Sequence, residues 1–167
     1  MSSRIAGRNR LIYTIENADL NFCVNEVYAP AQLYLTDCPI REVDPKNEPY
    51  GGHILKINQK RVLFRVAKVT DARPGAFVTI WKRSSTTQAI VPFDEADQID
   101  FLVIFAKNGR TQEKGQNVET GQFIFSRDLL LRKKIFSKDG LGGKLAMRVF
   151  PPWSAKVAQQ SVERSIE

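Results

Sequence analysis

Two segments of the sequence bring basic and aromatic residues together. The first reads FRVAKVTDARPGAFVTIWKR over 64–83, and the second reads RVFPPW over 148–153. Guanidinium and ammonium groups neutralise phosphates, and neighbouring aromatic rings offer faces on which bases stack. We therefore predict a surface for an anionic partner, formed by Arg65, Lys68, Arg73, Trp81, Lys82, Arg83, Arg148 and Trp153.

Basic residues within strands have a structural alternative. A buried cation without a partner costs several kcal/mol, so a residue such as Lys68 needs either an anion or a route to solvent at the strand end. Large aromatic side chains are most often part of a core, which applies to both tryptophans. Partners for an internal ion pair are available at Glu48, Asp94, Glu95, Asp97 and Asp100.

The carboxylates support a second, enzymatic hypothesis. Metal-dependent nucleases use two or more acids to hold Mg²⁺, because the developing charge on the phosphate must be neutralised. Such a site would combine Lys82 with carboxylates drawn from Glu48, Asp71, Asp94 and Asp100. Their spacing does not require them to meet, and a solvated acidic turn explains 94–100 equally well. We favour a non-catalytic protein without metal or cofactor, and keep a nuclease or phosphotransfer enzyme as the alternative.

Other catalytic motifs are missing from the sequence. His53 is the single histidine, and no Ser or Cys stands in a nucleophile motif, which argues against a catalytic triad. Phosphate-binding loops of the Walker type and dinucleotide glycine patterns are absent. Cys23 and Cys38 are not in a Cys-x-x-Cys pair and are expected to be reduced thiols, with too few histidines for a zinc site.

Composition indicates one folded, soluble domain. The chain has 167 residues, 43% hydrophobic and 26% charged, which suits a single domain over 1–167. A net charge of +7 favours polyanions, chiefly nucleic acid, as partners. The N-terminus lacks a secretory signal and no apolar run reaches membrane-spanning length, so we expect a cytoplasmic protein that does not bind membranes. No pattern in the sequence indicates the oligomeric state.

The first half of the chain predicts a helix followed by strands. Apolar residues recur at helical intervals near 18–29, with Asn17 or Asp19 as a cap and Pro30 as a stop. The Pro- and Gly-rich segment 37–52 is expected to be a loop. Three runs rich in β-branched and aromatic residues then predict an antiparallel meander, because hairpin-length gaps separate them: 53–57, 61–70 and 76–83.

Strand alternation assigns the side chains of the meander to faces. In the strand 61–70, alternate residues share a face, so Arg65 and Lys68 lie on opposite sides. One face holds Arg61, Leu63, Arg65 and Ala67, and the other holds Phe64, Val66 and Lys68. The same rule groups Phe77, Thr79, Trp81 and Arg83 in the next strand.

The second half of the chain centres on a buried strand. Residues 100–107 are apolar in succession, which is typical of a strand covered on both faces. Ser126 can cap a helix that begins at Arg127. The remaining expected elements are a polar connection over 108–121, a strand over 122–126, a turn over 138–143, a strand over 144–150 ended by Pro151, and a terminal helix from Ser154.

These motifs resemble the MepB family of small bacterial and fungal proteins. The similarity covers about 48–155 and is most specific in the segments AKVTDARPGAFVTIWKR and RVFPPW, while 1–47 form an N-terminal extension outside it. The matching residues are Arg65, Lys68, Thr70, Gly75, Phe77, Val78, Trp81, Lys82, Arg83, Arg148 and Trp153. The chain differs from the family pattern at Asp71, where Pro is usual, and at Ala76, where Gln is more frequent.

The resemblance implies a fold similar to that of restriction endonucleases, and nucleic-acid binding as the role. The fold class expected is α/β, bordering on α+β, with helices around one central mixed sheet. Nucleases of this fold carry an acid two residues before the lysine of the third meander strand. Here that position is Ile80, ahead of Lys82, and the acid nearest to the preceding strand is Asp71. The usual metal site is therefore incomplete, and the resemblance implies a degenerate, non-catalytic member.

Overall fold

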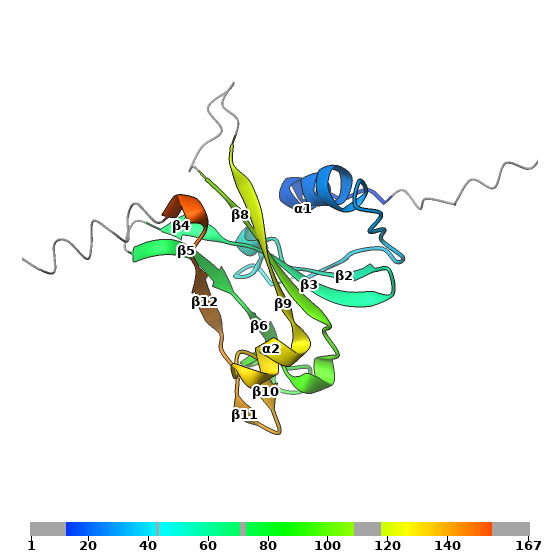
Figure 1. The fold of residues 1–167 in the computed structure, drawn as a ribbon. Helices are drawn as coiled ribbons and strands as arrows, with labels where there is room; N and C mark the ends of the chain where they lie inside the picture. Colours follow the sequence, from blue (N-terminus) through cyan, green and yellow to red (C-terminus); the bar gives the residue numbers. More distant parts are fainter. Residues whose placement is uncertain (1–12, 43, 71–72, 109–117, 155–167) are drawn as a thin grey trace, which may run out of the picture.

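The computed structural model describes residues 13–42, 44–70, 73–108 and 118–154. Figure 1 shows a larger sheet in the centre of the molecule, with α1 beside it and a smaller sheet on the opposite side. The terminal helix expected from Ser154 and the carboxylate Asp71 lie outside the described residues.

The larger sheet is mixed and has the order β1-β2-β3-β8-β9. Its strands are β1 (Ile40–Arg41), β2 (His53–Ile57), β3 (Lys60–Val66), β8 (Phe101–Lys107) and β9 (Thr120–Ser126). β3 and β8 run parallel, and the other neighbours run antiparallel. The expected interior strand is confirmed, because β8 lies between β3 and β9 and is buried over 102–106.

A three-stranded sheet with the order β12-β5-β4 forms a second layer. Its members are β4 (Lys68–Thr70), β5 (Arg73–Thr79) and β12 (Ala146–Val149), all antiparallel. The structure also contains two small hairpins. They are β6 (Trp81–Arg83) with β7 (Ile90–Pro92), and β10 (Ser137–Lys138) with β11 (Leu141–Gly142).

The predicted meander is wrong as a single sheet, although its two hairpins are present. The expected strand 61–70 divides at Ala67, whose N–H donates to the carbonyl of Phe105 at 2.8 Å. β3 consequently stays beside β8, while β4 leaves to pair with β5. The expected strand 76–83 divides in the same way at Ile80, whose N–H donates to the carbonyl of Leu145. Turn signals identify hairpins but do not specify which sheet a strand joins.

The helices are short and capped as expected. α1 (Ala18–Phe22) continues into a π-helical segment, η1 (Cys23–Tyr28), and the Leu20 N–H donates to Asn17 Oδ1 at 2.9 Å. α2 (Arg127–Arg132) has the predicted Ser126 cap but ends before residue 136, since Lys134 has a φ of 55°. Single 3₁₀ turns complete the described helices: η2 (Glu48–Tyr50), η3 (Glu95–Asp97) and η4 (Pro152–Ser154).

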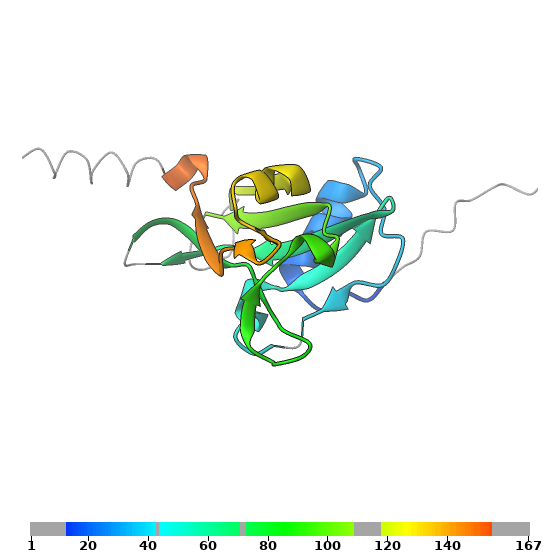
Figure 2. The same cartoon turned by 90° about the horizontal axis from the view of Figure 1, so that it is seen from below.

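The two faces of the larger sheet have separate cores. α1 and η1 cover one face, where Leu20 and Tyr28 pack with Phe64. The smaller sheet and α2 cover the other (Figure 2), where Leu63 packs with Val78 and with further buried residues. The alternation predicted for β3 is thereby confirmed. None of the described helices has the length and apolar character needed to cross a membrane.

Candidate functional site

A row of cationic and aromatic side chains crosses the smaller sheet. Lys68 on β4 is the register partner of Phe77 on β5, and Phe77 is the register partner of Arg148 on β12. Register partners in antiparallel strands project to the same face of a sheet. The neighbouring residues Ala76 and Val149 point the opposite way, into the core. The row therefore lies on the outer face of the β12-β5-β4 sheet.

Tyr50 completes this row from outside the sheet. Its ring lies edge-on to Phe77, with centroids 5.9 Å apart, and the Lys68 ammonium stands 5.5 Å from the Tyr50 centroid. The guanidinium of Arg148 lies 5.7 Å from the Phe77 centroid. Each cation is thus placed over a ring, where the ring quadrupole attracts it. We call Lys68, Tyr50, Phe77 and Arg148 the cation–aromatic row.

The row extends past Gly75 to Phe150. A Cβ at Gly75 would come within 2.8 Å of the Phe150 ring and of the Val149 carbonyl, so only glycine allows this close approach. Gly75 also has a φ of +78°, a conformation that glycine adopts without strain. Phe150 remains 58% exposed, which leaves an aromatic surface open to a ligand. Strand alternation places Arg73 on the same face, and Arg73 is exposed.

Arg148 also stabilises the β4–β5 turn through hydrogen bonds. Its Nη1 donates to the carbonyls of Arg73, Pro74 and Gly75 at 3.2, 3.2 and 3.3 Å. Its Nη2 donates to the hydroxyl of Thr70 at 2.7 Å. These acceptors are neutral, so none of the described contacts cancels the positive charge of Arg148.

The cations of the row lack carboxylate partners. Within the part of the chain that the structure describes, Lys68, Arg73 and Arg148 form no salt bridge. Lys68 and Arg73 are exposed, and Arg148 is half-buried. A phosphate placed here would meet positive charge that has no carboxylate counterion among the described residues.

Lys82 and Arg83, by contrast, are paired within the fold. Lys82 Nζ forms a short ion pair with Asp97, and Arg83 Nε donates to Asp44 Oδ2 at 2.6 Å. The Arg83 guanidinium also stands 5.4 Å from the Trp81 ring. Trp81 itself is only 6% exposed. Lys82 and Arg83, unlike the cations of the row, therefore have carboxylate counterions. Trp81 offers little surface for stacking.

Arg65 is fully buried, at 0% exposure. Its Nη2 donates to both Glu42 oxygens at 2.9 Å, and its Nε donates to the Thr79 carbonyl at 3.0 Å. Burial lowers the pKa of Arg65, while the Glu42 charge acts in the opposite sense. The structure thus places Arg65 between the two sheets, away from any surface that a phosphate could reach. The sequence predicted an internal ion pair as the alternative role of such cations, but it did not indicate Glu42 as the partner.

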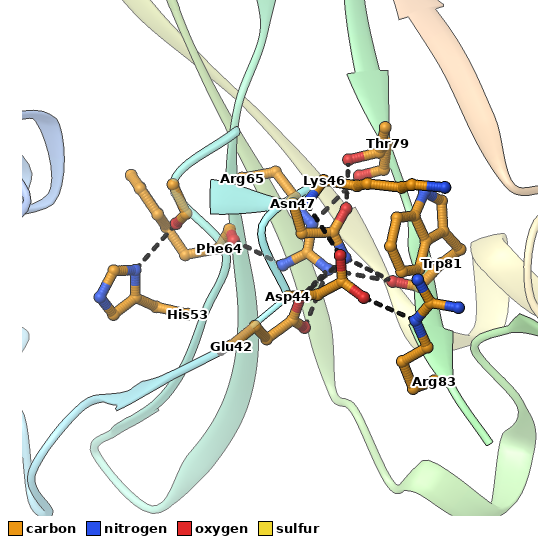
Figure 3. A network of polar contacts seen from close by, with 11 residues as sticks. Glu42, Asp44, Lys46, Asn47, His53, Phe64, Arg65, Thr79, Trp81 and Arg83 are labelled. Carbon is orange, nitrogen blue, oxygen red and sulfur yellow. Dashed lines mark hydrogen bonds and ion pairs between the residues drawn. The ribbon is translucent and has the colours of Figure 1, made fainter. Parts of the chain in front are cut away.

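Figure 3 shows the polar network around Arg65. Asn47, at 1% exposure, donates from Nδ2 to Glu42 Oε2 at 3.1 Å and to the Trp81 carbonyl at 3.2 Å. Its Oδ1 accepts from the Thr79 hydroxyl at 2.8 Å. The segment between β1 and β2 is thereby fastened to β5 and β6, and this attachment positions Tyr50 against Phe77.

Trp153 is half-buried and packs against the core cluster beneath the smaller sheet. Its ring would lie 3.5 Å from a Cβ at Gly121 on β9. Its buried Nε1–H has no partner among the described residues. The position of Trp153 thus indicates packing between η4 and β9 rather than an open stacking face.

The carboxylates of the enzymatic hypothesis are engaged in separate interactions. Glu48 pairs with Arg41, and Asp100 accepts from the Arg61 N–H at 2.9 Å. Asp94 accepts from the Ala96 N–H and the Ser137 hydroxyl, and these hydrogen bonds lower its pKa. The described residues contain no cluster of three His, Cys, Asp or Glu side chains able to hold a metal.

Sequence reasoning missed several residues that build the site. Tyr50 stands before two glycines in a turn-rich segment, which gives no indication of its contact with Phe77. Phe150 was treated as part of a strand, although the small residue at Gly75 was a possible signal of close packing. Glu42 and Asn47 carry no motif, so only the structure could reveal the network around Arg65.

The comparisons with known proteins agree with the resemblance seen in the sequence. A solved structure described as "Crystal Structure of MepB" aligns with a TM-score of 0.61 and 22% identity, over 90% of this chain and 95% of that one. The unaligned tenth is shorter than the 47-residue extension, so the structural similarity includes part of that extension. No curated protein matches the sequence. The family model described as MepB-like matches residues 44–165, and the chain belongs to the MepB-like family.

Proposed function

We propose that this protein binds nucleic acid without cleaving it, through the cation–aromatic row of the smaller sheet. The observation that carries the proposal is the register of Lys68, Phe77 and Arg148, which aligns cations and a ring on one face. Proteins that bind single strands combine a positive surface with rings on which bases stack. Tyr50 and Phe150 would supply further stacking faces.

The distribution of charge supports the same site. Lys68, Arg73 and Arg148 lack carboxylate partners among the described residues, whereas Lys82 and Arg83 are paired. Binding a phosphate at the row requires no internal ion pair to break. The net charge of +7 adds a general attraction for polyanions. Of the residues predicted from the sequence to bind phosphate, we therefore propose that Lys68, Arg73 and Arg148 do so directly. Lys82 and Arg83 add to the overall positive charge.

The proposal includes a fold related to that of restriction endonucleases, with a degenerate active site. A mixed sheet with a parallel β3–β8 pair supports the comparison. Lys82 follows Ile80, where such nucleases carry an acid, and Lys82 pairs with Asp97 rather than with a carboxylate of the enzymatic hypothesis. An intracellular location also belongs to the proposal and is supported by the two free cysteines.

The test is fluorescence anisotropy of labelled single- and double-stranded DNA and RNA over a series of salt concentrations. Each phosphate contact steepens the fall of log affinity with log salt by about 0.7 to 0.9. We expect Lys68→Ala with Arg73→Ala to flatten this slope by roughly 1.5. Lys56→Ala with Lys60→Ala is the matched control, because it removes the same number of positive charges from β2 and β3 of the larger sheet, away from the row.

Two outcomes of the binding experiment would overturn the proposal, and cleavage would overturn its non-catalytic part. One is the absence of salt-dependent binding to any of the four nucleic acids at low salt. The other is an equal change of slope in the site variant and the control variant. A denaturing gel of the same samples with Mg²⁺ or Mn²⁺ tests for cleavage, and shortened oligonucleotides that disappear with Lys82→Ala would make the protein an enzyme.

A further inference from the structure

A separate polar cleft lies between the N-terminal segment and the β1–β2 edge of the larger sheet. It has a volume of about 600 Å³ and is bounded by residues 14–18 on one side and by Arg41 and His53 on the other. Arg41 and His53 are register partners on β1 and β2, so they share one face. Glu16, Glu42 and Glu48 also line this cleft, which we call the His53 cleft.

His53 presents an unused hydrogen-bond acceptor in this cleft. Its Nδ1 lies 2.8 Å from the carbonyl oxygen of Gly51, and a carbonyl can only accept, so Nδ1 carries the proton. In the neutral ring Nε2 is then an acceptor. Nε2 has no partner among the described residues and is not one of their fully buried unpaired atoms, so it is open to a group in the cleft that His53 lines. Figure 3 shows this second nitrogen on the side of the ring away from the Arg65 network.

The surroundings of His53 lower its pKa and so favour the neutral ring. Burial is the main cause that lowers its pKa, and the nearby positive charge of Arg41 acts in the same direction. The carbonyl of Gly51 and the charge of Glu42 oppose this shift without outweighing it. A ligand group beside Nε2 must therefore donate a hydrogen bond.

The charged residues of the cleft leave one negative charge unmatched. The Glu42 carboxylate is balanced by the buried guanidinium of Arg65. Arg41 is shared between two carboxylates, with Nη1 at 3.4 Å from Glu16 and Nη2 in a short ion pair with Glu48. One cation cannot neutralise both of these acids. Among the described residues, the cleft therefore combines an excess negative charge with an acceptor, His53 Nε2, that has no donor.

We propose that the His53 cleft binds a small organic monocation with N–H donors, such as a guanidinium or primary ammonium group. One N–H would donate to His53 Nε2, and the positive charge would lie near Glu16 and Glu48. Two observations favour an organic cation over a metal ion. A cleft of this size exceeds a single ion, and no three-residue metal cluster occurs among the described residues. The site is independent of the nucleic-acid proposal, which involves a different sheet.

The single histidine makes this proposal directly testable by NMR, because the imidazole signals need no assignment. Butylguanidinium is titrated into the protein without nucleic acid, and the ¹⁵N shift of His53 Nε2 is followed. We expect a saturable shift and a further decrease in the pKa of His53, since a bound cation disfavours protonation of the ring. Butyltrimethylammonium has the same chain and charge but no N–H, so it should leave the Nε2 shift unchanged.

The variant Glu16→Gln with Glu48→Gln tests the role of charge. Both side chains are exposed at the mouth of the cleft, so the fold should be retained. We expect it to weaken butylguanidinium binding about tenfold, as two modest charge interactions would. Glu26→Gln with Glu119→Gln is the matched control, because both residues are exposed and outside the cleft. Equal shifts with butyltrimethylammonium, equal affinity in both variants, or no saturable shift would overturn the proposal.

Discussion

Both carboxylate oxygens of Glu42 lie 2.9 Å from Nη2 of Arg65, a side chain with no exposed surface. The pair attaches the segment after β1 to Arg65 on β3, and the guanidinium lies between the two sheets (Figure 3). Gly52 makes room for it, because a Cβ there would lie 2.9 Å from Glu42 Oε2. Arg65, although strongly basic, therefore stabilises the architecture of the protein and is not exposed to a ligand.

Glu42→Gln should strongly destabilise the protein. The substitution keeps the size of the side chain but leaves the Arg65 charge buried without a counterion, which costs about 3–5 kcal/mol. The free energy of unfolding in urea measures this loss. Glu95→Gln is the control, because the pair Glu95–Lys138 is partly exposed to solvent, unlike Arg65, and is worth about 0–1 kcal/mol. Equal losses in the two variants would show that the buried pair does not stabilise the fold.

Asn47→Ala should destabilise the protein by about 1–3 kcal/mol, the cost of leaving buried polar groups unsatisfied. The Thr79 hydroxyl would lose its acceptor and the Trp81 carbonyl would lose a donor. Thermal or urea unfolding measures the effect. Asn25→Ala removes an exposed amide that bonds only to Asn21, and it should change stability by less than about 0.5 kcal/mol. A comparable loss at both positions would contradict the importance of the network.

The two groups of cations should differ in their effect on nucleic-acid binding. Lys68→Ala with Arg73→Ala should flatten the salt dependence more than Lys82→Ala with Arg83→Ala. The reason is that Lys82 and Arg83 already have carboxylate counterions, at Asp97 and Asp44. Anisotropy over a salt series compares the two double variants. A larger effect from Lys82 and Arg83 would move the binding surface to β6.

Tyr50→Ala should reduce affinity without changing the salt slope. The ring contributes a stacking face, and base–aromatic stacking is worth about 1–3 kcal/mol per base. The charge of the surface is unchanged, so the number of phosphate contacts should be the same. Tyr50→Phe keeps the ring and should bind as the unmodified protein does. Loss of affinity in both variants would point to the hydroxyl instead of stacking.

The single histidine should titrate below its ordinary pKa. Burial disfavours the charged ring of His53, and the charge of Arg41 adds to this effect. Because the unfolded chain binds the proton more readily than the folded one, stability should fall as the pH drops below the ordinary histidine pKa. The ¹H shift of the imidazole over pH 4–8 measures the titration. His53→Gln should weaken the pH dependence of unfolding in this range, and a midpoint at or above the ordinary value would contradict the burial argument.

The Asp94 carboxylate should also make the stability of the protein depend on pH. Hydrogen bonds from Ala96 N–H and the Ser137 hydroxyl lower its pKa, so its stabilising effect is present above the unfolded pKa. That effect should be lost as the pH falls through the folded pKa. Comparing unfolding of Asp94→Asn with the unmodified protein from pH 6 to pH 2 measures it. The variant should show the smaller loss of stability over this range.

The sequence by itself determined the local elements. The cap at Asn17 or Asp19, the cap at Ser126, the buried strand predicted over 100–107 and the alternation along β3 were readable because each depends on nearest neighbours and on the period of the backbone. The family assignment was also present in the sequence, since the basic and aromatic motifs lie within 44–165.

Only the tertiary structure decided which sheet each strand joined. Hairpin turns predicted that neighbouring strands pair, but Ala67 bonds to Phe105 and Ile80 bonds to Leu145, and both partners are distant in the sequence. These long-range hydrogen bonds split the expected meander into two layers. No local pattern contains the information, because the competition is between remote backbone groups.

The roles of the cations were decided in the same way. Arg65 and Lys68 are three residues apart and have similar local sequences, yet Arg65 is buried against Glu42 and Lys68 is exposed over Tyr50. Composition fixed how much positive charge the chain has. Whether a given cation neutralises an internal acid or faces solvent depends on which carboxylate the fold brings within a few ångströms, and that is a property of the three-dimensional arrangement.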